Sequence, residues 1–92
     1  MQIHLNLKKH CIQTAAKTAH ERLVRACLAR SGDAETEAML QALQLFMETA
    51  DFARLRSEYP PLCGGAAEAV LKTDETNRRM SLHFGGTALD LN

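Results

Sequence analysis

The chain has 92 residues, of which 46% are hydrophobic and 24% are charged, and its formal net charge is zero. A chain this short buries only about 60–65% of its unfolded surface, so we expect one domain, residues 1–92, with a thin core. No stretch approaches the roughly 20 apolar residues of a transmembrane helix, and the N-terminus lacks the pattern of a secretory signal. The three cysteines are odd in number. These features predict a reduced, cytoplasmic protein that does not bind a membrane.

The N-terminal segment, residues 1–7, is predicted to be a β-strand because its apolar and polar side chains alternate strictly. Residues 8 to about 30 then predict a helix, which Gly32 is suited to end. The apolar stripe of this helix is rich in alanine, so another helix can pack closely against it. It comprises Ile12, Ala15, Ala16, Ala19, Leu23 and Ala26.

A second helix is predicted after Asp33, whose side chain is suited to cap it. The apolar stripe of this helix changes phase after Ala50, and a straight helix cannot bury both sets of side chains against one neighbour. We therefore expect a break near residues 49–51 and a short third helix that ends before Pro60. A fourth short helix is expected over residues 66–72, and residues 73–79 are expected to form a polar turn.

The C-terminal segment, residues 80–91, again alternates, around the pair Gly85-Gly86, and predicts a two-residue β-hairpin. With this turn, three cross-strand pairs share one face. They are Phe84 with Thr87, Leu82 with Leu89, and Met80 with Leu91. Ser81 then lies opposite Asp90 on the other face.

The predicted fold class is therefore α+β, with the element order β-α-α-α-α-β-β. Because a lone hairpin is marginally stable in water, the N-terminal strand and the C-terminal hairpin are expected to form one small three-stranded sheet. The helices are expected to pack on one face of that sheet. The sheet is completed either within one chain or across a dimer, because the N-terminal strand is an edge that needs a partner.

The sequence predicts no metal site, no cofactor and no catalytic residues. Cys11 and Cys27 lie sixteen residues apart on one predicted helix, about 24 Å along its axis, and cannot share a zinc ion. Cys63 precedes Gly64-Gly65 and a predicted helix start, which can lower the pKa of a thiol, but no nearby base in the sequence supports a nucleophile. The interpretation we prefer is that all three cysteines pack as small side chains.

Three apolar side chains lie off the predicted stripes and are candidates for contact with another protein: Val24, Leu28 and Leu45. Together with the absence of a catalytic set, they favour a small non-enzymatic protein-interaction module. Such a module would be a homodimeric subunit, an adaptor or a regulator, and its partner would be a second copy or a larger protein.

A nucleic-acid-binding regulator is the first alternative. Residues 8–30 carry six basic side chains against one acidic, a net charge of +5, whereas residues 31–58 carry a net charge of −4. The anion-binding face would comprise Lys8, Lys9, Lys17, Arg22 and Arg25.

A strand followed by a basic helix and a second helix resembles, in outline, the ribbon-helix-helix repressors, which pair N-terminal strands in a dimer and read DNA with them. In that reading Gln2, His4 and Asn6 would contact base edges. The long first helix and the C-terminal hairpin depart from that pattern, and the zero net charge is unlike that of a DNA-binding protein. A small-ligand pocket between the helices and the sheet is the second alternative.

Overall fold

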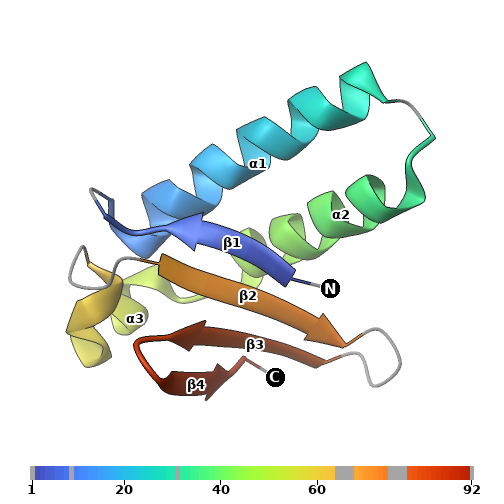
Figure 1. Cartoon of the computed structure of the whole chain (residues 1–92). Coiled ribbons are helices and arrows are strands. Elements are labelled where there is room, and N and C mark those ends of the chain that lie inside the picture. The colour runs from blue at the N-terminus through green and yellow to red at the C-terminus, as the bar shows by residue number, and fades with distance from the viewer. Residues whose placement is uncertain (1, 9, 31, 64–67, 75–78, 92) are drawn as a thin grey trace.

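The fold of the chain is given by a computed structural model, which describes residues 2–8, 10–30, 32–63, 68–74 and 79–91. Over these residues it is an α+β fold with three α-helices, one 3-10 helix and a four-stranded antiparallel sheet (Figure 1). In chain order the elements are β1 (Gln2–Asn6), α1 (Ile12–Ala29), α2 (Ala34–Thr49), α3 (Phe52–Glu58), η1 (Pro60–Leu62), β2 (Glu68–Asp74), β3 (Arg79–Phe84) and β4 (Thr87–Asp90).

The sheet has four strands in the order β1-β2-β3-β4, where three strands were predicted. The difference lies in residues 68–72, which were predicted to be helical and instead form most of β2; residues 66 and 67 lie outside the described part of the chain. In the structure β2 pairs with β1 through Leu5 and Ala69, and with β3 through Leu71 and Leu82. Strand β3 is the next strand along the chain, whereas β1 is distant in sequence, and pairing with both overrides the helix propensity of an alanine-containing segment. The pairing of β1 with β2 therefore lies within one chain.

The β3–β4 hairpin has the predicted register. Leu82 lies opposite Leu89, Phe84 lies opposite Thr87, and the amide of Leu91 donates to the carbonyl of Met80 at 3.0 Å. The turn glycines at positions 85 and 86 have φ values of +51° and +79°. Both angles are positive, as a type I′ turn requires, so the glycine pair accounts for the two-residue connection.

Helix α1 begins at Ile12, four residues later than predicted. Leu7 is fully buried directly after β1, and the amide of Lys8 donates to the side chain of Asn6 at 2.9 Å, so the chain turns before it becomes helical. The predicted alanine stripe is confirmed at its N-terminal half, where Ala15 and Ala16 are at most 3% exposed. Small side chains there allow α1 and α2 to pack side by side (Figure 1).

The predicted break between the second and third helices is confirmed: α2 ends at Thr49 and α3 begins at Phe52. The carboxylate of Asp51 accepts from the amide of Arg54 at 3.1 Å and so caps α3. Asp33 caps α2 in the same way, through the amide of Glu35. The break turns the chain, and it places the ring of Phe52 edge-on to that of Phe46 at 5.6 Å.

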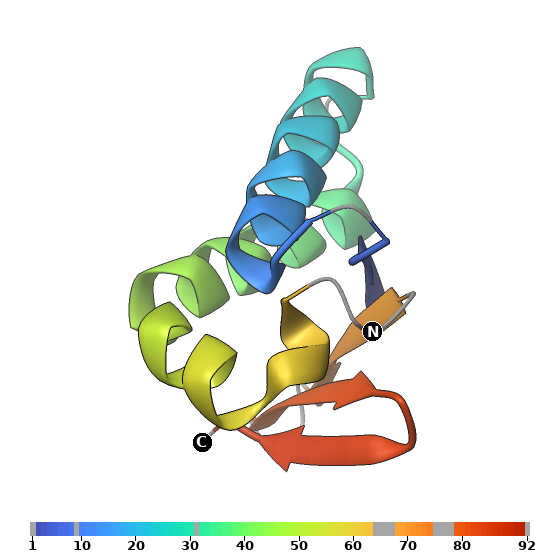
Figure 2. The same ribbon diagram turned by 90° about the vertical axis from the view of Figure 1, so that its left-hand side faces the viewer.

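The helices lie on one face of the sheet, as predicted, but they do not cover it evenly. In Figure 2, α1 and α2 lie together at one side, while α3 and η1 lie next to the β3–β4 hairpin. Helices α1 and α2 pack against β1, the first edge of the sheet. Across the described ranges, no helix combines the length and apolar character needed to cross a membrane.

Candidate functional site

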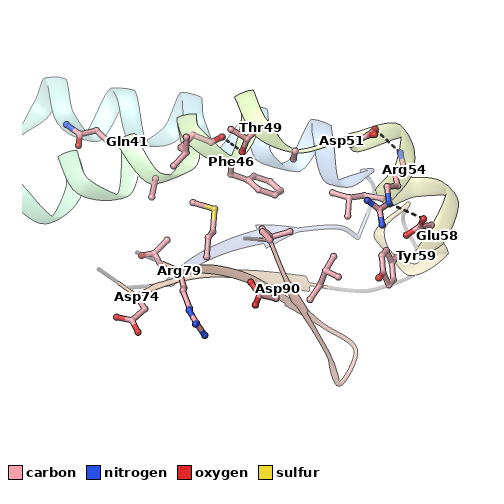
Figure 3. A pocket seen from close by; sticks show the side chains of 18 of the residues that line it. Gln41, Phe46, Thr49, Asp51, Arg54, Glu58, Tyr59, Asp74, Arg79 and Asp90 are labelled. Carbon is pink, nitrogen blue, oxygen red and sulfur yellow. Dashed lines mark hydrogen bonds and ion pairs between the residues drawn. The ribbon is translucent and has the colours of Figure 1, made fainter. Parts of the chain in front are cut away.

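A groove of about 1120 Å³ lies between the α2–α3 segment and the β3–β4 side of the sheet (Figure 3). Its walls are formed by the last three turns of α2, by α3, and by the ends of β2, β3 and β4. The large apolar side chains that line it come from both layers. They are Leu45, Phe46, Leu55, Tyr59, Met80, Leu89 and Leu91.

The groove exists because the helical layer leaves part of the apolar sheet face uncovered. Met80, Leu89 and Leu91 lie on the face that points toward the helices, yet all three are only half-buried. Helix α3 has seven residues and covers only one end of this face. The sheet therefore presents apolar side chains to solvent inside a concave surface, which is a common form of binding site.

Side-chain contacts and a hydrogen bond hold together the end of the groove at α3. The ring of Tyr59 packs edge-on against Phe84 at 5.8 Å, and Leu55 is buried beneath it. The guanidinium Nε of Arg54 donates to a carboxylate oxygen of Glu58 at 3.0 Å, one helical turn later. This hydrogen bond is the main cause of a raised pKa for Arg54, so the guanidinium stays charged.

The groove carries more acidic than basic side chains. Among the described residues that line it, four are acidic and two are basic, a net charge of −2: Asp51, Glu58, Asp74 and Asp90, with Arg54 and Arg79. Figure 3 shows Arg54 and Glu58 at one end, Asp74 and Arg79 at the other, and Phe46 pointing from α2 toward the sheet. An apolar floor with an acidic rim is suited to bind an apolar group flanked by positive charge.

The three predicted contact residues do not form one surface. Leu45 is 53% exposed and lines the groove. Leu28 is 81% exposed but lies at the C-terminal end of α1, and Val24 is half-buried one turn earlier. The end of α1 lies beside the start of α2 (Figure 1), whereas Leu45 lies eleven residues further along α2, about 16 Å by helix rise. Leu28 and Leu45 are therefore too far apart to belong to one contact surface.

The predicted basic face is spread over much of the exposed surface of α1. Lys17, Arg22 and Arg25 are all exposed, but Lys17 and Arg22 are about 140° apart around the helix axis. Lys8 is exposed in the turn before the helix, and Lys9 lies outside the described residues. These cations do not form a single stripe.

The outer face of β1 carries the three polar residues that the repressor resemblance assigned to base reading. Gln2, His4 and Asn6 are exposed, on the face opposite the helices. The Nδ1 atom of His4 contacts a carboxylate oxygen of Glu68 on β2. A carboxylate beside this histidine makes the face less suited to a polyanion than the sequence of β1 alone suggests.

The sequence reasoning offered a pocket between the helices and the sheet only as an alternative, without naming its lining residues, and it missed a pair of thiols. Off-stripe Leu45 was the only local sign of the groove, because Leu89 and Leu91 were expected to lie under helices. Cys11 and Cys63 lie with their sulfur atoms 2.6 Å apart, although 52 residues separate them and no spacing rule links them. Within the described part of the chain, no group of three or more His, Cys, Asp or Glu side chains is placed to hold a metal ion.

Comparison with known proteins places the chain in a family. A protein-family model matches residues 1–83, and the chain belongs to that family. The matched range ends within β3, so β4 lies beyond it. The chain is also similar to an uncharacterized protein of Archaeoglobus fulgidus, with 36% identity over 59 residues that cover 61% of this chain and 69% of the relative. No solved structure matches the chain.

Proposed function

We propose that this chain is a non-enzymatic protein-interaction module whose groove between α2–α3 and β3–β4 binds a basic amphipathic helix of a partner protein. The observation that carries the proposal is the half-covered sheet face. Met80, Leu89 and Leu91 line the groove together with exposed Leu45, so apolar side chains from two layers converge on one concave surface. Surfaces of this kind bind the apolar stripe of a helix through residues spaced three or four apart.

The size of the groove favours a helix over a small molecule. Its volume of about 1120 Å³ exceeds the roughly 300–1,000 Å³ of typical small-ligand pockets. It is also long, because it runs beside α2 from Ala38 to Thr49, which is about 16 Å of helix rise. Three turns of a bound helix would fit alongside this length.

The charge of the groove favours a basic partner. Its net charge of −2 attracts lysine and arginine side chains that flank an apolar stripe. The same charge disfavours two copies of the groove facing each other, because their acidic rims would repel. We therefore expect the partner to be a different protein, in preference to the homodimer that the sequence also suggested.

The proposal is tested with a synthetic peptide of about 18 residues, in which leucines spaced three and four apart form one stripe and lysines fill the remaining positions. Its binding is followed by fluorescence anisotropy of a dye at the peptide N-terminus. We expect saturable binding that weakens as salt is added. Two control peptides have either glutamates in place of the lysines or the same residues in scrambled order, and neither should bind comparably.

A matched pair of variants locates the site. Leu45→Gln removes an exposed apolar contact in the groove without changing charge, and we expect it to weaken peptide binding about tenfold. Leu28→Gln makes the same change at an exposed leucine outside the groove and should leave binding unchanged. Equal effects of the two variants, or no binding of the basic peptide to the unmodified chain, would show that the groove is not this docking site.

Two further measurements separate the alternatives. Light scattering at micromolar concentration should give the mass of one chain; twice that mass, restored to one by Leu45→Gln, would identify a second copy as the occupant instead. Titration of a labelled DNA duplex at low salt should show no binding. Saturable DNA binding that is lost when Arg22 and Arg25 are both changed to glutamine would favour the nucleic-acid alternative.

A further inference from the structure

The pair formed by Cys11 and Cys63 connects the two ends of the helical segment. Cys11 is the N-cap residue of α1, and Cys63 follows η1 as its C-cap residue. The two residues form an isolated antiparallel β-bridge, and their Sγ atoms lie 2.6 Å apart as free thiols. Residues opposed in an antiparallel bridge have Cα atoms roughly 4.5–5.5 Å apart, which lies within the range that a disulfide spans.

Both cysteines are held in place by backbone hydrogen bonds. The carbonyl of Cys11 accepts from the amide of Ala15 at 3.0 Å, in the first turn of α1. The amide of Cys63 donates to the carbonyl of Pro60 at 2.9 Å, in the last turn of η1. The two sulfur atoms are therefore positioned before any bond forms between them, and little backbone movement is needed to join them.

The exposure of the two thiols indicates which of them reacts first with an oxidant. Cys63 is exposed, whereas Cys11 is half-buried. A side-chain hydrogen bond with Cys63 is the largest cause of a raised pKa for the Cys11 thiol. The exposed sulfur is therefore the one that an oxidant in solution meets first, and the half-buried sulfur is the one positioned to resolve the product.

We propose that Cys11 and Cys63 form a reversible disulfide, a redox-controlled link between the start of α1 and the end of η1, through exchange with a low-molecular-weight disulfide. The thiolate of Cys63 attacks one sulfur of that molecule, forms a mixed disulfide and releases one small thiolate. The thiolate of Cys11 then attacks Sγ of Cys63 and releases the second. In total, two protein thiols and one small disulfide become one protein disulfide and two small thiols.

The disulfide would close a loop that contains α1, α2 and α3, because all three helices lie between Cys11 and Cys63. The two cysteines are 52 residues apart in the sequence. A cross-link over so long a segment restricts the unfolded chain strongly, so the oxidised protein should be more resistant to heat than the reduced protein. Cys27 lies in the last turn of α1, sixteen residues from Cys11, and cannot take part in this bond. It serves as an internal control.

The test exposes the folded, full-length chain to oxidised glutathione, then unfolds it and alkylates every remaining thiol. Intact mass should show one alkyl group per chain in place of three. Trypsin cleavage after lysine and arginine separates the three cysteines into residues 10–17, 26–30 and 57–72. We expect the first and third peptides to be joined, and the second to carry the alkyl group. Dithiothreitol should restore three alkyl groups.

Variants and melting temperatures complete the test. Cys27→Ser should still form the bond, while Cys63→Ser should not. Oxidation should raise the melting temperature by about 10 °C or more in the unmodified chain and in Cys27→Ser. Three alkyl groups after oxidation, a bond to Cys27, a bond between chains, or an unchanged melting temperature would overturn the proposal. The unmodified chain and Cys27→Ser decide this even if Cys63→Ser does not fold.

Discussion

The two halves of the sheet have similar apolar inner faces but differ in what covers them. On the β1–β2 half, Leu5 and Leu71 are fully buried, and α1 and α2 pack against β1. On the β3–β4 half, Leu82 is also fully buried, but Leu89 and Met80 are only half-buried and line a groove. An apolar sheet face thus becomes core where helices are long enough to cover it and is left lining an open groove where they are not.

Alanine substitutions in the two halves should give the largest difference in the free energy of unfolding. Leu71→Ala removes a fully buried side chain and should lower the free energy of unfolding by about 2–5 kcal/mol. Leu89→Ala removes the same atoms from the open half and should cost about 1 kcal/mol or less, because solvent already reaches the site. Urea unfolding followed by circular dichroism measures both. Equal costs would mean that the open half is packed as tightly as the covered half.

A substitution in the β3–β4 turn should have an intermediate effect on the free energy of unfolding, and this turn belongs to the open half alone. Gly86 has a φ of +79°, which a β-branched residue rarely adopts, so Gly86→Val should cost about 1–2 kcal/mol. Gly85→Asn is the control, because asparagine followed by glycine is the favoured pair in this turn. Urea unfolding should show Gly85→Asn to be nearly neutral. A neutral Gly86→Val would show that the hairpin contributes little to the stability of the fold.

The smallest expected effect concerns the turn between α1 and α2, beyond the covered half. The hydroxyl of Thr36 donates to the carboxylate of Asp33 at 2.8 Å and is the main cause of a lowered pKa for Asp33. A carboxyl whose pKa is lowered by folding stabilises the protein above its ordinary pKa of about 3.9. That contribution is lost as the pH falls through the lower, folded value.

This pH dependence is measured by thermal unfolding between about pH 5 and pH 2, with Asp33→Asn as the comparison. Asparagine keeps a side-chain oxygen that can cap the helix, but it does not titrate. The difference in melting temperature between the two chains should therefore shrink as the pH falls. A constant difference would mean that the Asp33 carboxylate has the same pKa in the folded and unfolded chain.

Several elements were predictable from the sequence because short-range contacts define them. The register of the β3–β4 hairpin follows from Gly85-Gly86 and from alternation on either side of it. The break between α2 and α3 follows from the change of phase in the apolar stripe after Ala50. The exposure of Leu28 and Leu45 follows from their positions on the helical wheel.

The strand β2 shows why other elements were not predictable. Its segment contains alanine, leucine, glutamate and lysine, which favour a helix when the segment is considered alone. The buried positions Ala69 and Leu71, with Thr73 two residues on, have the spacing of a strand, but that alternation is short and weak. Pairing with β1 on one side and β3 on the other decides its conformation; β3 is the next strand along the chain, but β1 lies near the N-terminus, with α1, α2 and α3 between them.

The sequence by itself determined the α+β class, the helix caps, the hairpin and the exposed leucines, because each depends on residues within one or two turns of each other. Only the tertiary structure decided the fourth strand, the groove and the contact between Cys11 and Cys63. Each of these depends on distances between residues far apart along the chain. Such distances are set when the helices and the sheet pack together, and no local pattern of side chains encodes them.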